Sequence, residues 1–137
     1  MSSADAPAGR TRPRILLVDD EPAVRTMIHA AVDLRGGQYD LVEAGNASEA
    51  VARAHADHPD LVLLDVALPD RDGFSVCREL KSSPPTAHIP VIMLTAMSLP
   101  SDRERAAEVG ADGFVVKPFS PRALLTLLDE RFGKQRS

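Results

Sequence analysis

Five residues of this 137-residue chain have side chains suited to catalysis or ligand binding, and they lie at the ends of apolar runs. They are Asp19, Asp20, Asp65, Thr95 and Lys117. Carboxylate oxygens are the ligands that Mg²⁺ prefers, and a lysine amine binds phosphate as a point charge. A threonine hydroxyl can donate a hydrogen bond to a phosphoryl oxygen. If the apolar runs are strands of one sheet, these groups meet at one edge. The residue types then predict a site for a divalent cation together with a phosphate group.

The apolar runs have the pattern of strands that are buried on both faces. Residues 61–64 read Leu-Val-Leu-Leu and residues 15–18 read Ile-Leu-Leu-Val, without a polar residue in either run. Such runs are typical of the central strands of a parallel sheet. Asp65 ends the first run and is followed by a loop that contains Pro69 and Gly73. In open α/β sheets ligands bind at the carboxyl ends of the strands, so Asp65 is predicted to lie at that edge.

Strands and helices are predicted to alternate along the chain. The strands are predicted at 14–18, 39–44, 60–64, 90–95 and 112–117, and the helices at 22–34, 47–57, 73–81, 101–109 and 121–132. Pro22 suits the first turn of the first helix, which Asp20 or Glu21 could cap. The 101–109 helix has only a weak apolar stripe. The Lys117–Pro118 bond is predicted to be cis, because the lysine must turn inward while the chain leaves the strand. Five strand–helix units predict an α/β fold, a doubly wound parallel sheet with helices on both faces.

Composition and charge limit the classes of protein to which the chain could belong. Four Phe, one Tyr and no Trp mean that the core must be aliphatic. One cysteine, Cys77, excludes an internal disulfide framework and favours a reducing compartment, so a cytoplasmic location is expected. A net charge of −4 without a basic face argues against direct nucleic-acid binding. No apolar run approaches the roughly 18 residues of a membrane span, so no membrane contact is expected.

The residues and their order resemble the response-regulator receiver domain, the phosphorylatable part of two-component signalling systems. The strings that carry the resemblance are ILLVDDEP, LVLLDVALPDRDG, IPVIMLTA and GADGFVVKPFS. The resemblance covers about residues 13–132, between a predicted disordered lead-in at 1–12 and a short tail at 133–137. It implies a five-stranded, flavodoxin-like sheet with the strand order 2-1-3-4-5.

The resemblance also implies a role for each polar residue at the strand ends. Asp65 would take a phosphoryl group from a phosphohistidine as an aspartyl phosphate, with Lys117 and Thr95 binding the phosphoryl oxygens. The expected cofactor is Mg²⁺, and its implied ligands are the carboxylates of Asp20 and Asp65, the backbone carbonyl of Ala67 and, through a water molecule, Asp19. The chain would then be a switch that phosphorylates and dephosphorylates itself rather than a turnover enzyme.

Output is expected to pass through Thr95 and Phe114. By resemblance, Thr95 moves towards the phosphoryl group and Phe114 enters the space that it leaves. The face formed by residues 101–109, 112–117 and 121–132 then changes shape. The implied partners are a sensor histidine kinase or histidine phosphotransfer protein and a downstream protein target. The chain is expected to be a monomer or a phosphorylation-dependent dimer.

Three other interpretations remain open from the sequence. An aspartate-nucleophile phosphatase of the dehalogenase type would carry a second acid where Ala67 stands. A pseudo-receiver, an interaction module that does not use phosphorylation, would normally lack one of the acids, the threonine or the lysine. The chain could also be a receiver cut from a larger response regulator or hybrid kinase, since residues 133–137 are too short for an effector domain.

Overall fold

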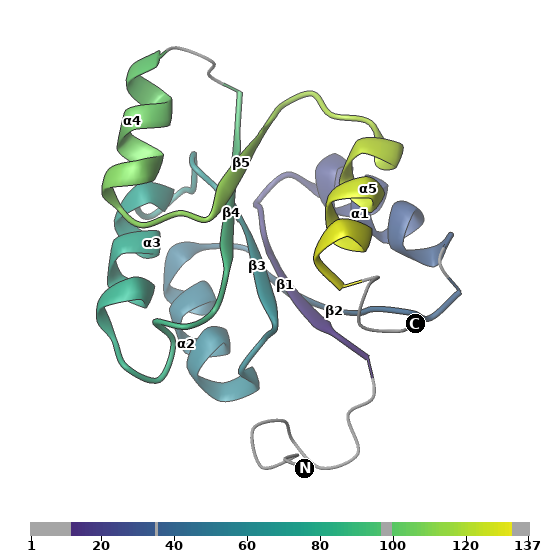
Figure 1. Cartoon of the computed structure of the whole chain (residues 1–137), viewed down its shortest axis with the longest axis horizontal. Coiled ribbons are helices and arrows are strands. Elements are labelled where there is room, and N and C mark those ends of the chain that lie inside the picture. Colours follow the sequence, from purple (N-terminus) through teal and green to yellow (C-terminus); the bar gives the residue numbers. More distant parts are fainter. Residues whose placement is uncertain (1–11, 35, 97–99, 133–137) are drawn as a thin grey trace.

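A parallel β-sheet runs through the centre of the protein (Figure 1), whose computed structural model describes residues 12–34, 36–96 and 100–132. Its strands, in chain order, are β1 (Arg14–Val18), β2 (Asp40–Ala44), β3 (Leu61–Asp65), β4 (Val91–Thr95) and β5 (Gly113–Val116). All neighbouring strands are parallel, and their order across the sheet is β2-β1-β3-β4-β5. The strand order and the parallel sheet predicted from the sequence are therefore confirmed.

Helices cover both faces of the sheet (Figure 1). They are α1 (Pro22–Asp33), α2 (Ala47–Asp57), α3 (Gly73–Ser82), α4 (Pro100–Glu108) and α5 (Pro121–Phe132). Helices α1 and α5 share one apolar cluster with the sheet, and α2, α3 and α4 share the other. Ile15 and Leu17 of β1 join the first cluster, and Leu16 and Val18 join the second. Strand β1 is thus buried on both faces, as its unbroken apolar sequence predicted.

Strand and helix boundaries agree with those predicted to within one residue at each end, and the small differences occur at the ends of both strands and helices. Strand β2 begins at Asp40, while Tyr39 is buried and its hydroxyl donates to Asp129 Oδ1 of α5 at 2.9 Å. Strand β5 ends at Val116, before the Lys117–Pro118 bond, which is cis as predicted. Residues 1–11 of the predicted lead-in and the whole predicted tail lie outside the described residues. No helix in the described part of the chain is long and apolar enough to cross a membrane.

The loop after β3 is anchored by two carboxylates. Asp70 accepts hydrogen bonds from the main-chain nitrogens of Ala47 at 2.8 Å and Ser48 at 3.1 Å, at the start of α2. The bond from Ala47 holds the pKa of Asp70 below its usual value. Asp72 caps α3, because its Oδ1 accepts from Phe74 N at 2.7 Å. The loop is therefore tied to the amino-terminal ends of two helices.

Candidate functional site

The carboxyl ends of the strands enclose a pocket of about 450 Å³. It is lined by Asp20, Glu21, Asp65, Val66, Ala67, Thr95, Ala96 and Lys117. Five of these residues were predicted as site residues from the sequence. The pocket lies at the sheet edge where open α/β proteins bind their ligands. Two of its residues are joined through the main chain, since Lys117 N donates to Thr95 O at 2.7 Å.

Lys117 is surrounded by three carboxylates. Its Nζ donates to Asp19 Oδ2 at 3.0 Å and to Glu21 Oε1 at 3.1 Å, and it lies 3.3 Å from Asp65 Oδ1. Asp19 is 0% exposed and Asp65 is 3% exposed. Buried carboxylates need a cation or hydrogen-bond donors nearby, and Lys117 supplies the cation for both. Asp65 also accepts a main-chain hydrogen bond from Ala67 N at 3.2 Å.

Glu21 belongs to this cluster, although it was not among the site residues predicted from the sequence. Among the described residues, Asp19, Glu21 and Asp65 form the group whose carboxylate oxygens lie within 4.8 Å of one another. Glu21 stands at the N-cap of α1, but its side chain makes no capping hydrogen bond and turns to Lys117 instead. Asp20 lines the pocket and is exposed. The sequence signal for Glu21 was its position directly after the acid pair.

The pKa values of Asp65 and Lys117 are both raised, although for different reasons. Burial, followed by the nearby charge of Asp19, raises the pKa of Asp65 above its usual value, although Lys117 opposes the change. Burial alone would lower the pKa of Lys117, but the hydrogen bond to Asp19 and the charges of Asp65 and Asp19 outweigh it. The pKa of Lys117 is therefore raised, and its ammonium group stays charged at neutral pH.

Replacing Asp65 with asparagine is expected to stabilise the metal-free fold at neutral pH by on the order of 1 kcal/mol. The raised pKa means that the ionised carboxylate costs stability, because the folded state holds the proton more tightly than the unfolded chain does. This cost shrinks as the pH falls through the folded pKa and vanishes below the ordinary value of 3.8. Urea unfolding of both proteins from neutral pH to about pH 3 should show stabilities that converge. An asparagine variant that is less stable than wild type at pH 7 would contradict this account.

Gly73, the first residue of α3, lies directly against the main chain of Asp65. A Cβ atom at position 73 would stand 2.1 Å from Asp65 O and 2.8 Å from Val66 Cα. Gly73 N donates to Val66 O at 2.7 Å, and Ala67 pairs with Asp72 in an isolated β-bridge. The loop is thus folded back on the end of β3, and only a residue without a side chain permits this approach.

Thr95 and Phe114, the predicted switch pair, lie on neighbouring strands. In the register of β4 and β5, Thr95 is opposite Val116 and Met93 is opposite Phe114. Because side chains alternate along a strand, Thr95 and Phe114 point to the face covered by α2, α3 and α4. Thr95 is buried and Phe114 is half-buried. The arrangement allows the predicted coupling, which stays a prediction.

Besides its buried residues Asp102 and Ala106, helix α4 contacts the domain through two exposed arginines. The guanidinium of Arg103 lies 5.0 Å from the centre of the Phe114 ring. That of Arg105 lies 4.4 Å from the centre of the Phe74 ring, and it donates to Asp72 Oδ2 at 2.7 Å. Exposed cation–π contacts contribute about 0.5–1 kcal/mol each. The weak apolar stripe predicted for this helix agrees with its few buried residues.

The fold and the pocket are those of one class of protein, and comparison with known families identifies that class. The profile of the response regulator receiver domain matches residues 15–129. The chain therefore belongs to this family and is a signalling switch rather than a turnover enzyme.

Individual relatives agree with the family match. The phosphate regulon transcriptional regulatory protein PhoB of Pseudomonas aeruginosa is 44% identical over 114 residues, which cover 83% of this chain and 49% of that protein. The chain spans about half the length of the curated relatives it matches.

Two solved structures have the same fold. The chemotaxis response regulator CheY4 of Vibrio cholerae superimposes with a TM-score of 0.81 at 31% identity, covering 88% of this chain and 98% of that chain. The receiver domain of the sensor histidine kinase PA1611 from Pseudomonas aeruginosa PAO1 gives 0.79 at 32% identity, with coverages of 90% and 99%. In that structure a magnesium ion is coordinated in the active site cleft.

Proposed function

We propose that Asp65 accepts a phosphoryl group from a phosphohistidine donor, and that the chain signals through the resulting change of its α4–β5–α5 face. The observation that carries this proposal is the environment of the Asp65 carboxylate. It is almost fully buried at a strand end, yet it lines an open pocket and has a charged lysine 3.3 Å away. A buried carboxylate with a fixed cation beside it is suited to receive a second anion.

In the proposed reaction an oxygen of Asp65 attacks the phosphorus of the phosphohistidine. A P–O bond forms while the P–N bond breaks, and the imidazole leaves with the electron pair of that bond. Phosphoryl transfer depends mainly on positioning and on neutralising charge. Lys117 supplies a positive charge beside the new phosphoryl group, and Thr95 supplies a hydroxyl donor from the same pocket.

We also propose that Mg²⁺ binds here through Asp20, Asp65, the carbonyl of Ala67 and, by way of a water molecule, Asp19. The donor set fits a hard cation, since three carboxylates bring oxygens within 4.8 Å of one another and Asp20 and Ala67 line the same pocket. When bound, the ion neutralises the clustered acids and the phosphoryl oxygens. Glu21 lies close enough to add a further oxygen to the site.

The phosphoryl donor is proposed to be a sensor histidine kinase or a histidine phosphotransfer protein. Beside the phosphoryl pocket lies a second pocket of about 420 Å³, formed by α1 and the segment after β5. The two pockets share Glu21, Ala96 and Lys117. Apolar side chains of α1, Val24 and Met27, offer contact area in this second pocket. A protein that delivers its phosphohistidine to Asp65 would cover this second pocket.

Phosphorylation by a small donor tests the proposal. Incubation with Mg²⁺ and acetyl phosphate should add one phosphoryl group, visible as a mass increase of the intact protein. Asp65→Asn should remain unlabelled, whereas Asp33→Asn, at the exposed far end of α1, should label as wild type does. A folded wild-type protein that takes no phosphoryl group would instead favour the pseudo-receiver. Labelling of Asp65→Asn at the wild-type rate would show that another residue is the acceptor.

Thr95→Ala is expected to keep at least half of the wild-type labelling and to lose most of the structural response. The nucleophile and the metal ligands are untouched, but the hydroxyl that links the phosphoryl group to β4 is gone. Hydrogen exchange of residues 100–132 should be measured with and without beryllofluoride, a phosphoryl mimic. Thr95→Ser, which keeps the hydroxyl, serves as the matched control. A full wild-type response in Thr95→Ala would remove Thr95 from the switch.

A further inference from the structure

The turn between β1 and α1, which carries the acids of the pocket, is held at the main chain of Asp19. Asp19 N donates to Ala44 O at 3.2 Å, and Asp19 Oδ1 accepts from Glu21 N at 2.8 Å. The carbonyl oxygen of Asp19 accepts from Arg25 Nη1 at 2.7 Å. Arg25 belongs to α1 and is not among the residues that line the phosphoryl pocket. It therefore holds the acidic turn from outside the site.

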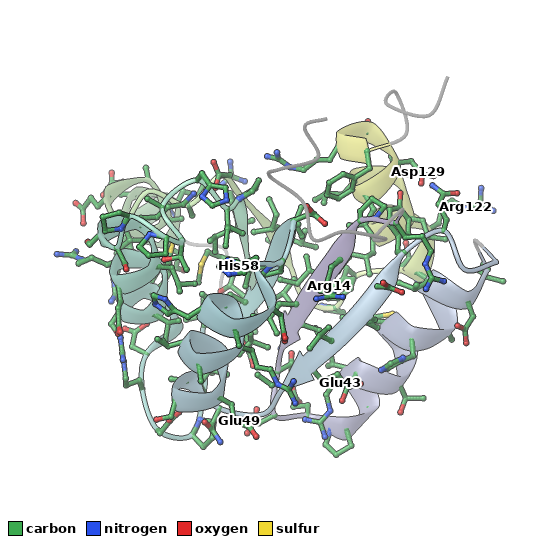
Figure 2. All side chains as sticks on the ribbon, turned by 90° about the horizontal axis from the view of Figure 1, so that it is seen from below. Arg14, Glu43, Glu49, His58, Arg122 and Asp129 are labelled. Carbon is green, nitrogen blue, oxygen red and sulfur yellow. The ribbon has the colours of Figure 1, made fainter. Side chains whose placement is uncertain are left out.

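The guanidinium of Arg25 is itself oriented by β2. Its Nε lies 3.5 Å from Glu43 Oε1, and the other carboxylate oxygen of Glu43 contacts His29 Nε2 of α1. Figure 2 shows Glu43 on β2, beside α1. An ideal Cβ atom at Gly45 would lie 3.7 Å from Arg25 Nη1, so the guanidinium sits close to the chain that leaves β2. A planar, forked group can bind a carbonyl on one arm and a carboxylate on another, which a lysine amine cannot do in the same geometry.

From these contacts we propose that Arg25, oriented by Glu43, is a positioning residue for the cation site; the inference rests on the proposed function of the pocket. The carbonyl of Asp19 and the nitrogen of Asp20 belong to one rigid peptide plane. Fixing the oxygen of that plane fixes the direction in which Asp20 leaves the strand. Arg25 thereby sets the position of a carboxylate that it does not touch. Without this hydrogen bond the peptide plane can rotate, and the carboxylate of Asp20 no longer keeps one fixed position relative to the carboxylate of Asp65.

The test measures Mg²⁺ affinity by NMR titration of the intact chain, without a phosphodonor. Arg25→Met removes the fork and keeps most of the side-chain length, and it should weaken Mg²⁺ binding about tenfold, as loss of an outer support of a metal ligand typically does. Arg25→Lys should recover part of the loss, and Glu43→Gln should weaken binding about two- to threefold. Arg53→Met, which removes an arginine paired with Asp57 on the exposed side of α2, should leave the affinity unchanged.

The outcomes separate a positioning role from a merely structural one. If Arg25→Met lowers the melting temperature but binds Mg²⁺ within twofold of wild type, Arg25 only anchors α1 and the proposal is overturned. If that variant does not fold, Glu43→Gln decides instead, and an unchanged Mg²⁺ affinity in Glu43→Gln overturns the proposal. Labelling of wild type by acetyl phosphate is judged separately. A wild-type protein that binds Mg²⁺ but takes no phosphoryl group refutes the proposed function, while the Mg²⁺ affinities still decide the role of Arg25. A wild-type protein that binds no Mg²⁺ refutes the role of Arg25.

Discussion

Gly73→Ala should destabilise the domain by at least about 3 kcal/mol, at the upper end of what overpacking a tight site costs. The added methyl would stand 2.1 Å from Asp65 O and 2.8 Å from Val66 Cα, which are main-chain atoms. Flexible side chains can move aside, but the end of a central strand cannot do so without breaking its pairing with β1 and β4. Urea unfolding of the purified variant would measure the loss.

Gly45→Ala is the matched control for this substitution. A Cβ atom at position 45 would have its nearest neighbours at 3.7 Å, the ends of the Arg25 and Glu49 side chains, which is ordinary van der Waals contact. Its effect on the free energy of unfolding should stay within about 0.5 kcal/mol. If the two variants are equally stable, the loop after β3 does not lie against Asp65 as described, and other contacts must hold Asp65 in place.

The second large effect is expected for Lys117→Met. This substitution should lower the free energy of unfolding by about 3 kcal/mol and abolish labelling by acetyl phosphate. The substitution leaves Asp19 and Asp65 buried without the cation that now lies 3.0 Å and 3.3 Å from them. Millimolar Mg²⁺ should restore part of the stability, because an ion that binds only the folded state stabilises it by mass action. Melting temperatures with and without Mg²⁺ would check both effects.

The pH dependence of this loss has a definite sign. The pKa of Lys117 is raised in the folded state, so its contribution is fully present below the ordinary lysine value of 10.5 and is lost as the pH rises further, through the folded pKa. The difference between wild type and Lys117→Met should therefore be constant around neutral pH and shrink above about pH 10.5. Lys81→Met, which breaks the pair with Asp112 at 2.8 Å, should lower stability without any rescue by Mg²⁺. Rescue of both variants alike would mean that the ion binds elsewhere.

Most of the fold, and the meeting of the main candidate site residues at one sheet edge, could be predicted from the sequence because their signals are local. An unbroken apolar run such as residues 61–64 is typical of a strand buried on both faces, and parallel strands bring their last residues to one edge. Asp65, Thr95 and Lys117 could therefore be placed in one site before any contact was known. The pocket brings these three together.

Residues whose role depends on a contact between distant segments could not be predicted in this way. Glu21 reaches Lys117 because the turn at Asp19 directs its side chain across the pocket, and no pattern in the residues encodes that direction. Arg25 is a polar residue within the predicted 22–34 helix, and its carboxylate partner stands on a strand at the edge of the sheet. The spacing that predicts an amphipathic helix carries no information about such pairs.

The way in which α4 is attached has a consequence for local unfolding of the domain. Apart from the buried Asp102 and Ala106, helix α4 is exposed and is held by stacked guanidinium groups and an exposed ion pair, so fewer buried contacts oppose its opening than oppose that of the central strands. Such a segment behaves as a separate unit of local unfolding, with a free energy of opening well below that of the whole domain. Asp65, in contrast, stands on a strand that is buried along its whole length. Under the proposed function, the residue that is phosphorylated and the helix that responds therefore differ in local stability, so α4 is expected to open more often than β3 does.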